Sequence, residues 1–541
     1  MNKEFSTEIA KDINGEMNWQ FACSMSSLKE LGSKIVKIDG KQLSLFLRGG
    51  TVYACNNRCP HEGFPLKEGT ISGKCILTCN WHNWKFDLST GDNLYGGDQL
   101  RIYPVRMDGD EIWLDVADAP AEQRIHQALQ NLQDSFPRHE YDRMAREIVR
   151  LEKAGGDPLD AVRETIKWTY DKFQFGMGDT HAFAAAADWL ALRAERATTA
   201  AEKLMPVHEI VAHFAWDTRR EDTYPYPDKV LSWQEDGFVE AIESEDEVKA
   251  IGYVRGALSE DKTWHDLERG FARAALAHYQ NFGHCAIYVL KTGELLEALG
   301  PSILEPVLLA LTRDLVSASR EDLIPEFRSY ASIKAEWHGP GTNDLCAQDF
   351  AGLGPEAAMK LITQGMQSPD ELYHVLFEVA CNSLLHFDLG KQDATDQSVS
   401  QNCTWLDVSH EITFANAVRQ LCGKYPELWH DALLQMGCFF GRNAGFQDSG
   451  IQLSDWLVKT PDAYLDQVKD SLFDHSTAEY IVTAHLVKMT FAVTGELEAS
   501  PDAPWKNTLL AGLNRFINSP LKRRHSLRTA SQALAFVGIE D

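Results

Sequence analysis

The chain has 541 residues, 44% of them apolar, and this length predicts more than one domain. Its formal net charge of −27 at neutral pH argues against binding to nucleic acid and suits docking to a basic redox partner. We expect no membrane span, because the sequence contains no run of about eighteen apolar residues.

The N-terminal segment, residues 1–16, is polar and predicts a flexible tail without the apolar region of a secretion signal. The chain has 11 cysteines in no regular framework, which is typical of buried thiols in a reducing compartment. We therefore expect a cytoplasmic protein.

Residues 17–117 consist of short runs in which β-branched and aromatic residues alternate with polar ones. Runs such as 34–38 and 111–116 are bounded by turn pairs, of which Asp39-Gly40 and Asp108-Gly109 are the clearest. Many short strands punctuated by turns predict a small antiparallel β domain.

Two pairs of metal-ligating residues lie within this β region. Cys59-Pro60-His61 is separated by 17 residues from Cys79-Asn80-Trp81-His82. Two thiolates and two imidazoles are the ligand set of a Rieske [2Fe-2S] cluster, in which the cysteines hold one iron and the histidines hold the other. A zinc site is disfavoured, because its ligand pairs usually have other spacings and lack the flanking Pro, Gly and aromatic residues.

These motifs closely resemble the Rieske ferredoxin and oxygenase family over residues 17–117. The resemblance implies a [2Fe-2S] cluster on Cys59, His61, Cys79 and His82, and an NAD(P)H-linked reductase as electron donor. Respiratory members of the family carry a disulfide and hydroxyl donors at positions that correspond here to Phe64, Trp81, Trp84 and Phe86. Fewer hydrogen-bond donors to the cluster sulfurs predict a low reduction potential.

From residue 118 to residue 541 the strand pattern gives way to long amphipathic stretches, which predict one large all-α domain. Examples are residues 141–154, 181–196, 267–290, 410–422 and 477–493. Thr180 and Ser409 provide helix start signals directly before two histidines. The whole chain is thus predicted to be multidomain, with a small all-β domain followed by a large all-α domain.

Several histidines of this region lie within apolar helical faces, where an imidazole needs a polar partner. They are His181, His278, His284, His410 and His485. Three or more of these rings, if they converge, would make an iron site with open positions for O₂ or a substrate.

Four short segments here resemble the questin oxidase-like family, an all-α group that acts on polyketide quinones and related aromatic compounds. The segments begin at His181, Gly283-His284, His410 and His485, and the last of them includes Lys488. The resemblance implies that His181, His284, His410 and a carbamylated Lys488 bind iron, with His278 and His485 as further ligands or neighbours. His410 and Lys488 are the expected catalytic residues. Carbamylation is required because an ammonium group cannot ligate a metal.

Three alternatives remain open. A conventional Rieske oxygenase site would use His208, His213 and Asp217 or Asp222, although we predict no sheet around them. A di-iron helical bundle would use Glu371 with His374 and Glu427 with His430, although both glutamates fall in first helical turns, where acidic residues are favoured in any case. A Rieske electron carrier or redox sensor with a non-catalytic helical domain is the third.

The predicted function is therefore that of an iron-dependent oxygenase. A reductase would reduce the Rieske cluster, and the cluster would reduce a non-haem iron in the helical domain. That iron would activate O₂ against a small organic substrate, aromatic or polyketide-like. Because electron transfer falls steeply with distance, we expect a homo-oligomer or a tightly docked monomer.

Overall fold

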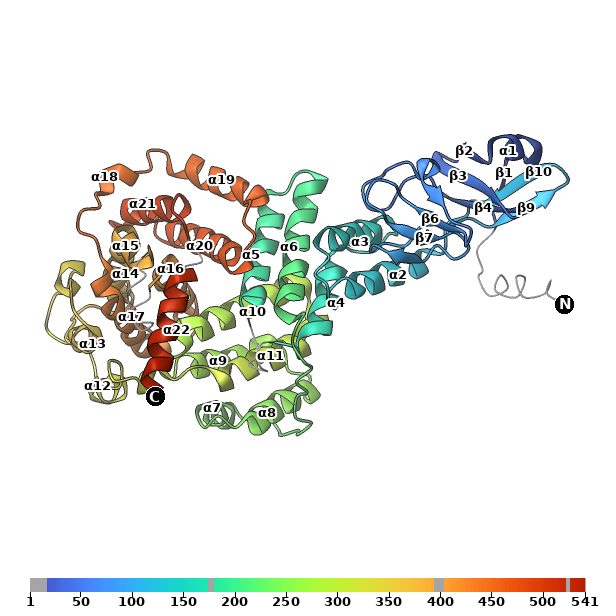
Figure 1. The fold of residues 1–541 in the computed structure, drawn as a ribbon. Helices are drawn as coiled ribbons and strands as arrows, with labels where there is room; N and C mark the ends of the chain where they lie inside the picture. Colours follow the sequence, from blue (N-terminus) through green and yellow to red (C-terminus); the bar gives the residue numbers. More distant parts are fainter. Residues whose placement is uncertain (1–16, 174–179, 394–402, 522–525, 541) are drawn as a thin grey trace. The chain divides into compact units, whose positions relative to one another are not determined.

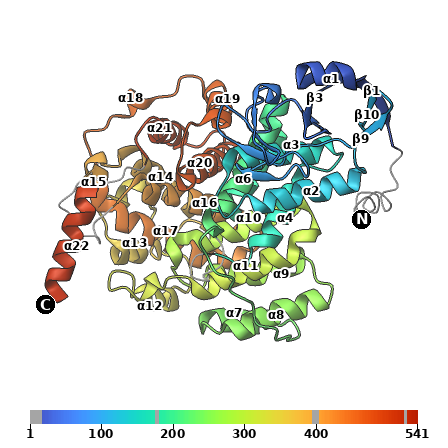
Figure 2. The same ribbon diagram turned by 45° about the vertical axis from the view of Figure 1, so that its right-hand side comes forward.

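The computed structural model describes residues 17–173, 180–393, 403–521 and 526–540, so the predicted tail over residues 1–16 lies outside the described part. The chain divides into two compact units, Met1–Ala161 and Val162–Asp541, which are described separately. Figures 1 and 2 show the β strands in the first unit and helices throughout the second.

The first unit contains three small antiparallel sheets. One has the order β1 (Trp19–Ser24), β10 (Glu111–Asp115), β9 (Val105–Asp108), and another has the order β2 (Ser33–Ile38), β3 (Lys41–Arg48), β4 (Thr51–Asn56). The third has the order β5 (Thr70–Ile71), β6 (Ile76–Thr78), β7 (Lys85–Asp87), β8 (Asn93–Tyr95). The short helix α1 (Met25–Leu31) links β1 to β2.

The turn pair Asp39-Gly40 joins β2 to β3, as the sequence predicts. Both residues have positive φ, 48° and 73°, which is the geometry of a tight hairpin whose twist matches that of the strands. The all-β region ends with β10, and the first long helix begins at Ala121, so the change from strand to helix is confirmed.

Two helices complete the first unit, α2 (Ala121–Asp134) and α3 (Tyr141–Lys153), and they pack against each other. Helix α3 buries Met144, Ile148 and Leu151 on one face, together with the carboxyl group of Glu147. The division between the compact units falls after these helices, at Ala161, within α4 (Leu159–Thr169).

The described elements of the second unit are helices. Four long ones, α5 (His181–Arg196), α10 (His284–Leu299), α16 (Trp405–Lys424) and α20 (Tyr480–Ala499), pack in a closed ring in which each contacts the next. The others are α6 (Ala200–Thr218), α7 (Glu235–Glu243), α8 (Glu247–Ser259), α9 (Trp264–Ala275), α11 (Leu304–Ser317), α12 (Tyr330–Glu336), α13 (Pro355–Ile362), α14 (Pro369–His386), α15 (Leu389–Asp393), α17 (Trp429–Asn443), α18 (Leu453–Trp456), α19 (Pro461–Ser471), α21 (Lys506–Ile517) and α22 (Ser526–Glu540).

Two predicted helix boundaries are wrong. The stretch 267–290 is not one helix, because Asn281, Phe282 and Gly283 have positive φ and separate α9 from α10. Ser409 does not begin a helix either, since α16 begins at Trp405, where Thr404 and Asp407 form a capping box. Thr180 does cap α5, accepting a hydrogen bond from the Ala182 amide.

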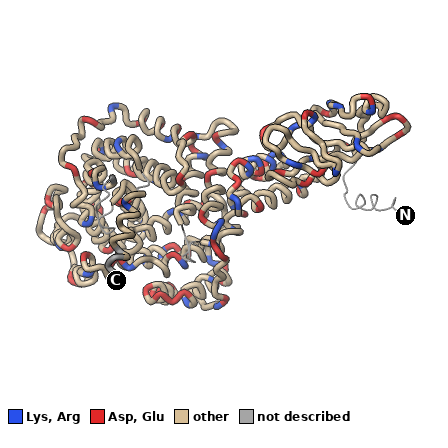
Figure 3. Tube along the Cα trace, viewed as in Figure 1, with Lys and Arg blue, Asp and Glu red and all other residues tan. Residues whose placement is uncertain are grey.

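The surface is acidic, with 79 Asp and Glu residues against 52 Lys and Arg residues. Figure 3 shows the basic residues dispersed among acidic ones along the described part of the chain. In that part, no helix is both long enough and apolar enough to cross a membrane.

Candidate metal centres

The cysteine and histidine pairs of the first unit lie on two loops of the same construction. In one loop the Cys59 amide donates to the Phe64 carbonyl over 2.9 Å, and the Gly63 amide donates to the Cys59 carbonyl over 2.8 Å. In the other loop Cys79, Asn83 and Trp84 repeat this pattern, with distances of 2.8 and 2.9 Å. Gly63 and Asn83 both have positive φ, which Gly and Asn tolerate best. Matching turns therefore present the two Cys and His pairs.

The side chains of these loops face one another at the tips. The Nδ1 atoms of His61 and His82 lie 3.1 Å apart, and the two side chains are 24% and 39% exposed. Cys59 and Cys79 are buried beneath them. These four residues would therefore hold a cluster through two buried thiolates and two partly exposed imidazoles.

The donor set fits such a cluster. Burial raises the pKa of the Cys59 thiol to about 12, even though the His61 amide lowers it. A thiolate here therefore needs a cation beside it, which a [2Fe-2S] cluster provides. Phe64 stacks on Trp81 with ring centroids 6.1 Å apart, and Trp84 stacks on His61 at 4.5 Å. These aromatic rings pack around the two loops.

Comparison with known proteins agrees with this geometry. The family model of the Rieske [2Fe-2S] domain matches residues 18–102. The ferredoxin subunit of 3-phenylpropionate/cinnamic acid dioxygenase from Escherichia coli (strain K12) is 33% identical over 106 residues, which is 19% of this chain and 98% of that protein. The subunit of the same name from Shigella boydii serotype 4 has the same identity and coverage. This chain belongs to the Rieske [2Fe-2S] family.

Solved structures of a ferredoxin and of a terminal oxygenase are similar to about a fifth of the chain. The ferredoxin of carbazole 1,9a-dioxygenase from Nocardioides aromaticivorans IC177 is 27% identical, with coverage of 18% of this chain and 97% of that one and a TM-score of 0.17. The terminal oxygenase of carbazole 1,9a-dioxygenase from Novosphingobium sp. KA1 is 26% identical, with coverage of 19% and 30% and a TM-score of 0.18.

Four histidines of the second unit converge inside the ring of long helices. His181 begins α5, His284 begins α10, His410 lies on α16 and His485 lies on α20. The Nε2 atoms of His181 and His284 are 3.2 Å apart, and those of His410 and His485 are 3.4 Å apart. The two pairs adjoin, because the ring centroids of His284 and His410 are separated by 4.3 Å. We call these residues the four-histidine cluster.

Hydrogen bonds on the far side of the rings determine which nitrogen faces the centre. Nδ1 of His284 donates to the Asn281 carbonyl over 2.5 Å, and Nδ1 of His485 donates to the Ile481 carbonyl over 2.6 Å. Each Nε2 atom of these two residues is therefore an acceptor in the neutral ring. Each of them lies opposite the Nε2 atom of another imidazole, so a proton or a metal ion has to lie between the two nitrogens. Backbone carbonyls that orient imidazoles in this way are typical of histidine metal sites.

The electrostatic environment keeps these imidazoles neutral. Burial, together with the nearby Lys488 and the other rings, lowers the pKa of His181 well below its usual value, and burial lowers that of His284 to about 3. The pKa of His410 is likewise well below its usual value, chiefly because of burial. Neutral imidazoles bind metal ions without first losing a proton, so these residues could hold one.

Lys488 completes the site. It follows His485 by about one turn of α20, and its Nζ atom is buried with no hydrogen-bond partner in the described part of the chain. Burial lowers the pKa of Lys488 to about 8, although the carboxylate of Asp188 opposes this shift. A buried amine without a partner is costly, so a further group at this position is expected to interact with it.

Two further residues of the site, Tyr288 and Asp188, are absent from the predicted ligand set. The Tyr288 hydroxyl lies 3.5 Å from Nδ1 of His181, and Asp188 lies on α5 two turns after His181. Asp188 binds the ammonium of Lys291 over 2.7 Å. The signal was the helical spacing, since Tyr288 is four residues after His284 and Asp188 is seven residues after His181.

His278 lies outside the four-histidine cluster. This residue lies beyond the end of α9, before the chain turns into α10, and its Nδ1 atom is 3.0 Å from a carboxylate oxygen of Glu243. Its Nε2 atom lies 3.8 Å from Asp322. The break in the predicted helix 267–290 is the reason, because it separates His278 from His284.

The residues of the alternative iron sites occupy other environments. His213 pairs with Asp217 over 3.4 Å on α6, while His208 lies five residues earlier on the same helix and therefore on another face. Glu371 accepts hydrogen bonds from the amide and hydroxyl of Ser368, which caps α14. Glu427 pairs with Arg269 over 2.8 Å. These glutamates thus have the helix-end and surface roles that helix physics favours.

Proposed function

We propose that this Rieske protein is an oxygenase in which the [2Fe-2S] cluster supplies electrons to a non-haem iron bound by the four-histidine cluster. The observation that carries the proposal is the convergence of His181, His284, His410 and His485 with the unpartnered amine of Lys488. Four helices that are distant in the sequence deliver these groups to one point, which a purely structural core does not require.

The cluster, when bound, accepts and donates one electron at a time. Its protein ligands define how electrons reach it, because His61 and His82 are partly exposed whereas Cys59 and Cys79 are buried. The imidazole edges are therefore the route by which an NAD(P)H-linked reductase would deliver electrons. A homo-oligomer or a docked arrangement of the two units would bring the acceptor site within reach.

Lys488 is proposed as a carbamylated ligand. With a pKa of about 8, an appreciable fraction of its amine is neutral near pH 7.5 and can attack CO₂. The step forms an N–C bond, releases one proton and leaves a carbamate whose oxygen atoms are acceptors. The product satisfies the orphaned nitrogen position and adds a negative charge beside the neutral imidazoles, which favours a divalent iron.

A cavity of about 390 Å³ that is lined in part by His181 supports access to this site. Its walls include Trp216, Tyr480 and the pair His213 and Asp217. Tyr480 stacks on His213 with centroids 5.1 Å apart. An aromatic wall next to a candidate iron ligand supports a small aromatic or polyketide-like substrate and entry of O₂ by the same opening.

A single-turnover experiment tests the function. The cluster is reduced without oxygen, O₂ is added, and reoxidation is followed by the cluster absorbance. We expect rapid reoxidation in the natural protein and reoxidation slowed at least about tenfold in His410→Ala. This variant should retain the absorbance of the [2Fe-2S] cluster. His278→Ala is the matched control, since it removes a buried histidine outside the four-histidine cluster. If His410→Ala reoxidises at the natural rate and retains all its iron, the assignment is wrong.

A second candidate function is electron delivery to a separate oxygenase. It is favoured by the curated relatives, which are named as ferredoxin subunits of a dioxygenase. In that case reduced protein would pass electrons to an added acceptor protein equally well with and without His410. None of the 11 cysteines, all of which lie in the described part of the chain, forms a disulfide, which supports a reducing cytoplasm for either function.

A further inference from the structure

The imidazole of His61 is held by a short series of contacts that ends on a helix. The Trp84 ring stacks on His61 with an interplanar angle of 10°. Gly96, which follows β8, packs its backbone against Trp84, so that a Cβ atom there would overlap the indole ring. Its φ of +135° also favours glycine. Trp84 therefore contacts both a cluster ligand and the loop formed by residues 93–98.

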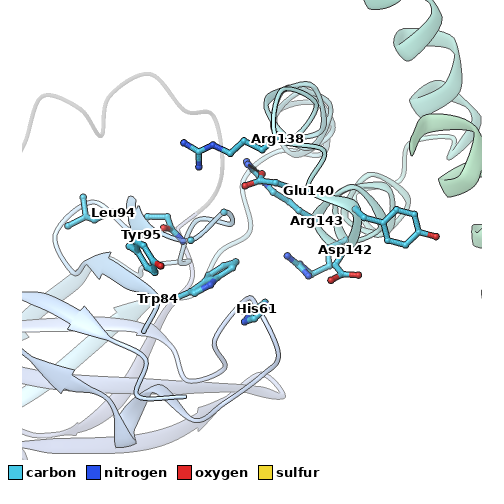
Figure 4. Close-up of a pocket in the computed structure, with 13 residues that line it drawn as sticks. His61, Trp84, Leu94, Tyr95, Arg138, Glu140, Asp142 and Arg143 are labelled. Carbon is cyan, nitrogen blue, oxygen red and sulfur yellow. Dashed lines mark hydrogen bonds and ion pairs between the residues drawn. The ribbon is translucent and has the colours of Figure 1, made fainter. Parts of the chain in front are cut away.

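Helix α3 holds the far side of this loop. Gly97 packs on Arg143, whose Cδ atom would lie 3.3 Å from a Cβ at that position. The Asp98 carboxylate, which is fully buried, binds Arg146 at both oxygens over 3.1 and 2.6 Å and Arg150 over 2.6 Å. Figure 4 shows His61 and Trp84 facing Glu140 and Arg143 across a cavity of about 700 Å³.

The same loop is rigid within itself. The Asn93 side-chain amide donates to the Asp98 carbonyl over 2.8 Å, which closes the segment around Gly96. Burial opposes ionisation of Asp98, but the hydrogen bond from Arg146 and the charges of Arg150 and Arg146 hold its pKa below the usual value. The ion pairs are thus present at neutral pH, and a buried, bidentate arginine pair is among the stronger and better-directed contacts in proteins.

We propose that α3 acts as a latch on the Rieske cluster: Asp98, Arg146 and Arg150 are positioning residues that hold the loop 93–98 against Trp84 and so fix the His61 ring and exclude water from one of its faces. The arginines lie outside residues 18–102, which the family model matches, so the latch joins the Rieske domain to the helices that follow it. Orientation of a ligand and its access to solvent are among the properties that set the reduction potential of an iron–sulfur site.

The direction of the effect distinguishes this latch from simple electrostatics. The reduced cluster carries one more negative charge, so admitting water around His61 stabilises it and raises the potential. Removal of a positive charge by itself destabilises the reduced cluster and lowers the potential. Arg146→Gln both admits water around His61 and removes a positive charge. The latch predicts that the increase in potential caused by water is larger than the decrease caused by the lost charge. Lys153→Gln removes a charge from an exposed position of the same helix without touching the loop.

The experiment measures the ratio of reduced to oxidised cluster at one fixed applied potential, together with its electron paramagnetic resonance spectrum, in full-length protein with the cluster fully loaded. We expect a ratio about threefold or more higher in Arg146→Gln, with shifted g values. Arg146→Lys should restore most of the natural ratio, and Lys153→Gln should lower it slightly or leave it unchanged.

Gly96→Ala tests the contact with Trp84 without any change of charge. It should raise the ratio in the same direction as Arg146→Gln. If this variant loses the cluster, the comparison of Arg146→Gln with Arg146→Lys and Lys153→Gln decides alone. The proposal is overturned if Arg146→Gln has the g values of the natural protein and if its ratio of reduced to oxidised cluster, like that of Lys153→Gln, is slightly lower or unchanged.

Discussion

At the scale of single residues, Lys488 carries the clearest physical signal in the second unit. Its amine is buried beside neutral imidazoles and lacks a hydrogen-bond partner in the described part of the chain. Folding therefore desolvates a charge, and the attraction of Asp188 offsets only part of that cost in the metal-free protein. A residue that costs stability in this way is best explained by the group that it binds when the site is filled.

This cost predicts a pH dependence of the free energy of unfolding. The pKa of Lys488 is about 8 in the folded protein and 10.5 in the unfolded chain. Between these values only the unfolded state holds the proton, so the stability of metal-free protein should rise with pH from about 8 to 10.5, by up to ~1.4 kcal/mol per pH unit. Below pH 8 both states hold the proton, so the full cost of burying the charged amine remains.

Lys488→Met should abolish that rise and be more stable than the natural protein at pH 7, by about 1–3 kcal/mol. The measurement is urea unfolding with a chelator present, followed by the helical circular dichroism signal. Lys153→Met, at an exposed position, serves as the control and should keep the rise. An undiminished rise in Lys488→Met would show that another group titrates.

The sequence identifies individual site residues better than it predicts which of them lie together in the folded protein. Histidines next to small apolar residues, such as His181 and His485, are recognisable because a buried imidazole needs a partner. Which imidazoles meet is decided by the packing of four distant helices, which no local pattern encodes. His278 has neighbours of the same kind as His284, yet it pairs with Glu243.

At the scale of elements, helix starts decide where the site lies. His284 takes its place because α10 begins there, after a break at Asn281, Phe282 and Gly283. Apolar periodicity runs through this break, so the sequence pattern predicts a continuous helix. A single glycine in the chain does not reveal the left-handed turn, because glycine is also tolerated within helices.

Gly283→Ala should therefore destabilise the second unit and misplace His284. The residue has φ +73°, and a Cβ atom would lie 2.6 Å from Phe414 and 2.7 Å from Phe439. We expect a loss of about 2–4 kcal/mol in the free energy of unfolding, from strain and overpacking together. Gly352→Ala is the matched control, since φ is +72° but nothing lies within 4 Å, and it should lose only about 1–2 kcal/mol. Equal losses in the two variants, measured by urea unfolding, would contradict the packing argument.

At the scale of the whole molecule, each of the two compact units contains one candidate metal site. The first unit has a Rieske ligand set whose histidine edge is exposed, and the second has a buried imidazole site with its own cavity. The β part was predictable because its Cys and His spacing is specific and local. The helical part yields its class from periodicity, whereas its centre becomes visible only when α5, α10, α16 and α20 are assembled.

The most direct measurement is the number of iron atoms per chain in purified protein and in two variants. We predict three in the natural protein, two in His410→Ala with the visible spectrum of the cluster intact, and one in Cys59→Ala with that spectrum lost while the helical circular dichroism remains. Two iron atoms in the natural protein after loading with ferrous iron and bicarbonate, with no change in His410→Ala, would contradict the existence of an iron site in the helical unit.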